Sequence, residues 1–222
     1  MTLHFIREMD NLHRDLVTMC SMVEEHISDA VEGLINQPRE LGAELAGRDK
    51  QVDEWDVHIE EECLKILALY HPVAHDLRRV AAVMKITGEL ERVADLSVSI
   101  AQRADGISAF PGFPIPDRLA EMSQEALSML HSSIDAYVES DSQLARSVCS
   151  RDDGVDALNV ELLNETRSVM QSRPEFIEPA MHLFSAIRHI ERVADHATNI
   201  AEDVVYLVEG EIIRHPGLQR ST

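Results

Sequence analysis

The sequence is short of aromatic residues and of cysteine. Aromatic residues make up 4% of the 222 positions, whereas hydrophobic residues as a whole make up 45%. A core built from Leu, Val, Ile, Ala and Met favours packed helices over a β-sandwich, which depends on aromatic and β-branched pairs. The three cysteines, Cys20, Cys63 and Cys149, are odd in number and far apart. They argue against a disulfide framework and fit a reducing cytoplasm.

Long apolar runs and positive charge are also scarce. No window reaches the ~18 uninterrupted apolar residues of a membrane span. Charges at Arg7, Glu8 and Asp10 precede any apolar run, so we expect no signal peptide. The balance of 20 Lys+Arg against 40 Asp+Glu gives a net charge of -20, which repels nucleic acid and anionic membranes. We therefore expect a cytoplasmic protein with no nucleic-acid partner and no direct membrane insertion, suited to binding cations or a basic partner surface.

Prolines divide the chain into long segments whose apolar residues recur every three and four positions. This is the helical period, and proline breaks helix interiors. The segment GISAFPGFPIP at 106–116 holds three of the eight prolines and is the clear linker. We predict six helices, at 3–36, 39–70, 73–105, 115–139, 141–172 and 177–209.

Two sequence blocks occur twice, in the same order. RDKQVDEWDV at 48–57 recurs as RDDGVDALNV at 151–160, and GELERVADLSVSIA at 88–101 recurs as RHIERVADHATNIA at 188–201. Recurring blocks on either side of a linker indicate an internal duplication. The sequence therefore predicts an all-α chain with a first three-helix repeat at 1–108, a linker at 109–116 and a second repeat at 117–222.

The repeated ERVAD segment places a glutamate and an aspartate one helical turn apart. Glu91 and Asp95 lie within the apolar arc if the third helix is phased on Met84 and Leu77. We therefore expect the pair to face inward, where two like charges need compensation. The second repeat has the same arrangement at Glu191, Asp195 and Glu202.

The second helix of each repeat adds further acids. Asp49 and Asp53 are four residues apart, and Asp152 and Asp156 repeat the pattern. If the second and third helices pack together, each repeat gains a patch of carboxylates that suits a hard divalent or trivalent cation. The competing interpretation is a solvated acidic edge with the ERVAD arginines in salt bridges between helices.

Carboxylates in a helical bundle raise the possibility of a metal-dependent enzyme or a metal store. The ferritin-like class uses Glu-x-x-His motifs, and none of the 11 histidines has Glu three positions before it. No Gly-rich phosphate loop, nucleophile elbow or HExxH motif occurs, so we predict no catalytic residues. His182, His189 and His196 recur every seven residues and predict one flank of the last helix.

At these motifs the sequence resembles the PhoU family of phosphate-signalling proteins. The resemblance rests on the duplicated E-x-x-x-D motif, on HPVAHDLR at 71–78, and on NIAE at 199–202. It implies two tandem three-helix bundles related by pseudo-two-fold symmetry. It also implies a negative regulator of phosphate uptake and of the phosphate-starvation response. Such a regulator links the ATPase of a phosphate ABC transporter to a sensor histidine kinase.

The resemblance also implies a site and a cofactor. Iron or zinc is the expected metal, and a homodimer is the expected assembly. Ser99 and Gln102 stand where the second repeat has Asn199 and Glu202, so the first site is expected to be the weaker one. The HPVAHDLR segment has no copy in the second repeat, and its Asp76 and Arg78 are expected to contact a partner. The implied metal ligands are Glu91, Asp95, Glu191 and Asp195, supplemented by Asp49, Asp53, Asp152, Asp156 and Glu202.

Overall fold

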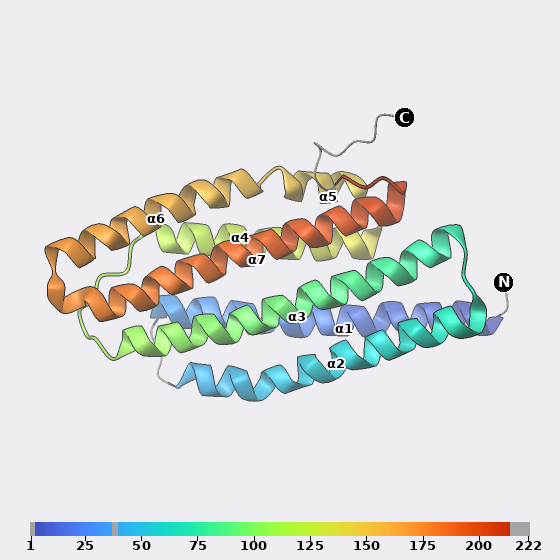
Figure 1. Cartoon of the computed structure of the whole chain (residues 1–222), viewed down its shortest axis with the longest axis horizontal. Helices are drawn as coiled ribbons and strands as arrows, with labels where there is room; N and C mark the ends of the chain where they lie inside the picture. Colours follow the sequence, from blue (N-terminus) through green and yellow to red (C-terminus); the bar gives the residue numbers. More distant parts are fainter. Residues whose placement is uncertain (1–2, 37–39, 214–222) are drawn as a thin grey trace.

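The computed structural model describes residues 3–36 and 40–213, which form helices and no strand (Figure 1). The first and last predicted helices match the structure at both ends, and the all-α fold class is confirmed. The predicted start of the second helix at residue 39 lies outside the described residues. The helices are α1 (Leu3–Asn36), α2 (Leu41–Tyr70), α3 (Ala74–Ser108), α4 (Arg118–Glu139), α5 (Ser142–Cys149), α6 (Asp152–Ser172) and α7 (Ile177–Glu209), with a 3-10 turn at Pro174–Phe176.

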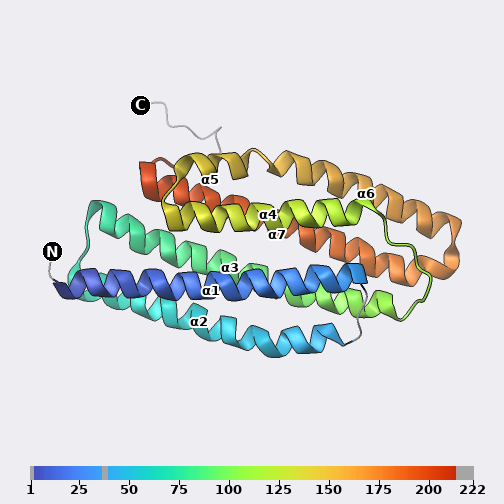
Figure 2. The same ribbon diagram turned by 180° about the vertical axis from the view of Figure 1, so that it is seen from behind.

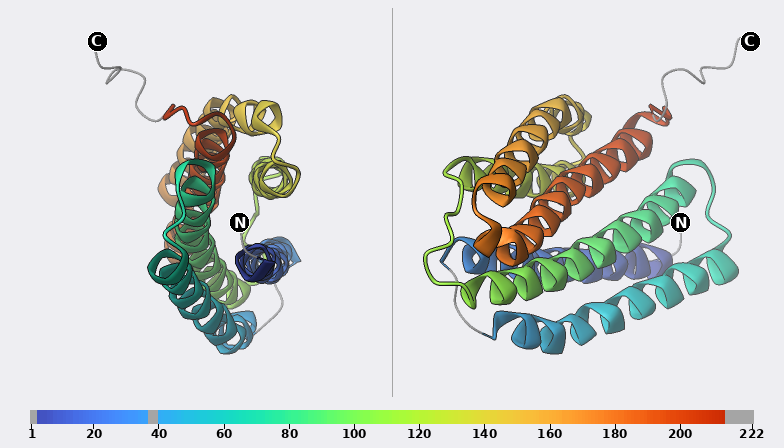
Figure 3. Two further views of the ribbon diagram at one scale, coloured as in Figure 1. Left: turned by 90° about the vertical axis from the view of Figure 1, so that its right-hand side faces the viewer. Right: turned by 60° about the vertical axis from the view of Figure 1, so that its left-hand side comes forward.

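Four helices form a curved layer in the order α2, α3, α7, α6, and α1 and α4 cover one side of it (Figures 1, 2 and 3). The two repeats thus meet along α3 and α7 at the centre of the layer. The opposite side of this layer carries no further helix from the described part of the chain. We call this side the open face. None of the described helices is long and apolar enough to cross a membrane.

A single hydrophobic core runs through both repeats. In α1 the predicted apolar stripe is buried, with Leu12, Leu16, Met19, Val23 and Ile27 each at most 2% exposed. Burial of such a stripe stabilises a helix far more than its intrinsic propensity does. Residues from both α3 and α7 belong to the same buried cluster, so the two repeats share one core.

Helices α3 and α7 run antiparallel in a constant register. Each step forward along α3 corresponds to the same step backward along α7. A Cβ built on Gly106 would lie only 2.6 Å from His182 Nε2, so the histidine ring lies directly on that glycine. The contacts that fix the register are Lys85 with Asp203, Glu89 with Asn199, and Gly106 with His182.

This register is symmetric under exchange of the two repeats. Positions in α3 and α7 that are 100 residues apart correspond in sequence, and the register then places Ala94 opposite its own counterpart, Ala194. Both alanines are buried, which allows the two helix backbones to approach closely. The pseudo-two-fold axis therefore passes between Ala94 and Ala194, within the two ERVAD segments.

The predicted fifth helix is divided in two at Ser150 and Arg151. The amide of Ser150 donates back to the carbonyls of Arg146 and Val148, which ends α5. The Arg151 side chain turns toward α4 and donates to Glu125 and to Ser128. Asp152 and Asp153 then occupy the first turn of α6, where acidic side chains favour the positive end of the helix dipole.

Helix α2 begins without a local side-chain cap and takes one from α3 instead. Asp105 accepts hydrogen bonds from the amides of Leu41 (3.1 Å) and Gly42 (2.8 Å). A Cβ on Gly42 would lie 2.9 Å from Asp105 Oδ2 and 3.1 Å from Gln102 Cα, so glycine is required for this approach. The carboxylate satisfies two of the amides that a helix start leaves unpaired.

Removing this carboxylate is expected to lower stability. Asp105→Ala should reduce the free energy of unfolding by about 1–2 kcal/mol, because two charge-assisted hydrogen bonds at a helix start are lost. Urea unfolding followed by circular dichroism measures the difference. Asp117→Ala is the matched control, since Asp117 precedes α4 without a side-chain cap, and it should change the value by less than about 0.5 kcal/mol. Equal effects of the two variants would contradict the assignment.

Candidate functional site

The ERVAD acids lie on the side of α3 and α7 that faces away from the core. Glu91 and Glu191 are half-buried, while Asp95 and Asp195 are exposed. The expectation that these pairs face inward is therefore wrong. Leu77, which helped to set the phase of α3, is itself exposed, and so is Phe184 of α7, to which Glu191 and Asp195 stand in the same relation.

The central position of α3 explains the error. The helix packs against α1, α2 and α7, so it carries apolar residues around most of its circumference. Its buried side is defined by residues such as Val83, Leu90 and Ala94, not by Met84. The acids consequently lie on the open face.

The first acidic cluster spans α2 and α3. Burial raises the pKa of Asp49 to about 6, with the charges of Asp53 and Asp95 adding to the effect. Burial and the charge of Asp95 also raise the pKa of Glu91. Because acids of α2 and α3 perturb one another, the two helices bring them together as predicted. Arg92 lies 3.2 Å from Glu91 and 3.7 Å from Asp95 on the same helix, so its salt bridges do not link two helices.

The second cluster spans α6 and α7. Burial raises the pKa of Asp152, helped by the charges of Asp195 and Asp156. Burial likewise raises the pKa of Asp195, with Asp156 the next cause, and that of Glu191, with Asp195 the next cause. Thr198 donates a 3.3 Å hydrogen bond to Asp152, which lowers that pKa in part. The two helices therefore place Asp152, Asp156, Glu191 and Asp195 close enough for their charges to act on one another.

Glu202, the fifth predicted residue, lies further along α7. It contributes to a groove of about 370 Å³ with Lys85 and Tyr206, and its charge acts on Cys149 of α5. Eleven residues separate it from Glu191, which is about three helical turns and ~16 Å along α7. Asp152 of the second cluster also acts on Cys149, so a ligand role for Glu202 stays a prediction.

Two oxygen atoms near the second cluster are buried without a hydrogen-bond partner among the described residues. They are Glu191 Oε2 and Asn159 Oδ1. Asn159 corresponds to Asp56 of the first repeat, whose charge raises the pKa of Glu91. The sequence alone assigned no site to Asp56 or Asn159, although the alignment of the two repeated blocks shows that they occupy equivalent positions. A buried acceptor without a donor is a place where a cation or an ordered water is stabilising.

The clusters have the chemistry that a hard cation needs. Several carboxylates with raised pKa values, one of them with a buried oxygen lacking a donor, supply oxygen ligands and an excess of negative charge. Within residues 3–36 and 40–213, no three His, Cys, Asp or Glu side chains already converge as ligands of one ion. The donor types are those that a hard cation prefers, and Asp95 and Asp195 are the exposed members of the two clusters.

Arg78 of the HPVAHDLR segment lies against the end of α7. A Cβ on Gly210 would lie 3.6 Å from Arg78 Cζ, so the guanidinium covers the carboxyl end of that helix, where the dipole is negative. Asp76 lies in the first turn of α3, with an oxygen 3.9 Å from His75 Nδ1. A partner role for Asp76 and Arg78 remains a prediction, and Arg78 also has this contact within the chain.

The acidic clusters make the stability of the metal-free protein depend on pH. Folding raises the pKa of Asp49, so the protonated carboxyl favours the folded state. This stabilisation is fully present below about pH 4 and is lost as pH rises through about 6. Asp49→Asn is therefore expected to stabilise the metal-free protein at pH 7, by at most about 1 kcal/mol because solvent screens the half-buried charge. Urea unfolding of both proteins at pH 4 and pH 7 tests this. A variant that is no more stable than the wild type at pH 7 would contradict it.

Comparison with known proteins identifies the family. The model of the PhoU domain matches residues 16–104 and again residues 119–204. The chain belongs to the PhoU family. A relative from Pseudomonas putida, named as a phosphate-specific transport system accessory protein PhoU homolog, is 33% identical over 98% of this chain and 86% of its own length. The two matches fall in the two sequence repeats, so each repeat is one PhoU domain.

Solved PhoU structures have the same fold. The crystal structure of PhoU from Pseudomonas aeruginosa superposes with a TM-score of 0.90 at 32% identity, covering 93% of this chain and all of the other. The phosphate transport system regulatory protein PhoU from Streptococcus pneumoniae gives 0.87 at 28% identity, covering 94% of this chain. The arrangement of two PhoU domains around α3 and α7 is thus shared by PhoU proteins of distant bacteria.

Proposed function

We propose that this chain is a negative regulator of phosphate uptake and of the phosphate-starvation response. In this role it acts without catalytic turnover, as an adaptor between the ATPase of a phosphate ABC transporter and a sensor histidine kinase. The observation that carries the proposal is the match of both repeats to the PhoU domain, together with relatives named as transport-system accessory proteins over nearly the full chain. An accessory protein of a transporter acts by binding, and the chain offers separate surfaces for doing so.

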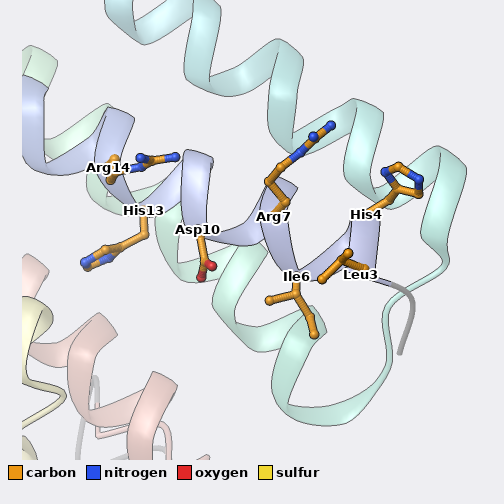
Figure 4. Close-up of a pocket in the computed structure, with 7 residues that line it drawn as sticks. All are labelled: Leu3, His4, Ile6, Arg7, Asp10, His13 and Arg14. Atoms are coloured by element: carbon orange, nitrogen blue, oxygen red, sulfur yellow. The ribbon is translucent and has the colours of Figure 1, made fainter.

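One such surface runs along the first turns of α1. A groove of about 570 Å³ lies there, and Figure 4 shows the residues that line it. Leu3 and Ile6 are exposed apolar side chains, and Arg7 and Arg14 add positive charge to a strongly acidic molecule. Apolar residues with a basic rim are typical of a protein-binding surface. This groove lies on α1, on the other side of the layer from the acidic clusters.

The acidic clusters are proposed to hold a divalent or trivalent metal, with iron or zinc as the first candidates. Glu91, Asp95, Asp49 and Asp53 would serve the first site. Glu191, Asp195, Asp152 and Asp156 would serve the second. The buried Glu191 Oε2 without a donor supports the second site, and the raised pKa of Asp49 supports the first. A bound cation would neutralise these groups and release protons near pH 6.

A deletion strain tests the regulatory role. With ample phosphate, loss of the gene should raise expression from a phosphate-responsive reporter, and the wild-type gene supplied in trans should restore repression. Normal reporter expression in the deletion strain would rule the role out. Expression of the transporter and the kinase must be checked, so that a missing partner is not mistaken for a missing regulator.

Binding assays test the adaptor role separately. The purified chain should retain the transporter ATPase and the sensor kinase from detergent extracts, and Ile6→Glu should weaken retention if the α1 groove is the contact. The matched control is Val160→Glu, an exposed apolar residue on α6. Retention of neither partner by the wild-type chain would contradict the adaptor role.

A further inference from the structure

The contact between α3 and α7 has two ends that the pseudo-two-fold axis relates, and their charges are opposite. At one end lie Glu89 and Asp203. Their counterparts at the other end, 100 positions away in the sequence, are His189 and Arg103. Two acidic residues are thus replaced by two basic ones at equivalent positions of one symmetric contact. We call these the acidic end and the basic end.

At the acidic end, both carboxylates contact a cation or hydrogen-bonding side chains of the same chain. Lys85 Nζ lies 2.7 Å from Asp203, which is buried. His196 Nδ1 lies 2.6 Å from Glu89, and Asn199 donates to the same oxygen at 3.1 Å. Each carboxylate therefore has its counter-charge or donors across the contact.

At the basic end, two buried nitrogen atoms lack such partners. Arg103 Nε and His189 Nδ1 are both buried and have no hydrogen-bond partner among the described residues. The other ring nitrogen of His189 lies 3.2 Å from the Ser185 hydroxyl. By the register of the two helices, Ser99 and Arg103 lie opposite His189 and Ser185. The residues that contact the carboxylates at the acidic end, His196 and Lys85, correspond here to Leu96 and Ser185.

The register of the two helices places four polar side chains together at the basic end. An arginine, a histidine and two serines, which are Arg103, His189, Ser99 and Ser185, thus lie at one place in a chain of net charge -20. Arg103 Nε is a buried donor without an acceptor, which is costly, so the site gains stability from an anion.

We propose that the basic end binds a small tetrahedral oxyanion of the phosphate type. Arg103 would supply charge and a planar pair of donors, and the Ser99 and Ser185 hydroxyls would add hydrogen bonds. The acidic end cannot bind an anion, so one site is expected per chain. The proposal uses none of the acidic-cluster residues and does not depend on the regulatory role.

Titration calorimetry with inorganic phosphate tests the proposal on the full-length protein. The protein is first treated with a chelator, so that phosphate held through a metal at the acidic clusters is not counted. We expect saturable binding of one phosphate per chain. Arg103→Gln should weaken it by about ten-fold or more, because a charge-assisted contact is lost. Arg167→Gln, which removes an exposed arginine from α6, should bind as the wild type does.

Two further variants keep the test decisive. If Arg103→Gln loses its helical circular dichroism, Ser185→Ala carries the test and should weaken phosphate binding by a few-fold. Glu191→Gln/Asp195→Asn should bind phosphate as the wild type does, since only the metal cluster is altered. Absence of saturable binding to the chelated wild type, unchanged binding to both Arg103→Gln and Ser185→Ala, or loss of binding only in the acidic-cluster variant would each overturn the proposal.

Discussion

Replacing Glu191 and Asp195 by Gln and Asn is expected to weaken metal binding at the second cluster by more than about 100-fold. Both carboxylates are proposed ligands, and hard cations lose most of their affinity when anionic oxygen ligands become neutral. Calorimetric titration with Fe²⁺ or Zn²⁺ measures the affinity. The variant should remain helical, because Asp195 is exposed and neutral residues relieve repulsion in the cluster.

The equivalent change in the first repeat is the matched control. Glu91→Gln/Asp95→Asn should weaken the first site and leave the second unchanged. In the wild type the second site should be the stronger, because Glu191 is the more buried of the two glutamates, with 14% of its side chain exposed against 23% for Glu91. Unchanged affinities in both variants would show that the metal binds elsewhere.

A second large effect is expected where the two repeats meet at the acidic end. Lys85→Met should lower the free energy of unfolding by about 2–4 kcal/mol, because Asp203 is buried and loses its ion-pair partner. The double variant Lys85→Met/Asp203→Leu should recover most of that loss, since an apolar pair of similar size avoids burying a charge. Urea unfolding of the four proteins of this cycle gives the coupling energy.

The double variant separates two explanations of the Lys85 effect. Lys85 also lies over the Tyr206 ring, 5.9 Å from its centroid. If packing on Tyr206 were the main contribution of Lys85, Met would retain most of it and the single variant would be nearly as stable as the wild type. A double variant less stable than Lys85→Met would contradict the ion-pair account.

The helices were predictable because proline and hydrophobic period are local signals. Helices α1 and α7 begin and end where the sequence predicts, and the repeated blocks predict the duplication that the two PhoU matches confirm. The break at Ser150 and Arg151 was missed, since it depends on Arg151 reaching α4, a contact distant in sequence.

The orientation of the acids was not predictable, for a physical reason. A helix with neighbours on three sides has no single apolar stripe, so its phase cannot be read from period alone. The cap of α2 by Asp105 was hidden in the same way, because donor and acceptor lie 63 and 64 positions apart. The opposite charges at the two ends of the α3–α7 contact appear only once the register of those helices is known.

We propose that the duplicated acidic clusters are the metal sites of a PhoU regulator. The metal content of the purified protein tests this most directly. Elemental analysis is made on wild-type protein and on Asp95→Asn/Asp195→Asn, both purified from cells without added metal. The wild type should carry at least one iron or zinc ion per chain. The Asp95→Asn/Asp195→Asn variant should keep its helical circular dichroism and carry much less metal. A wild type without stoichiometric metal, or a variant with the same metal content as the wild type, would contradict the claim.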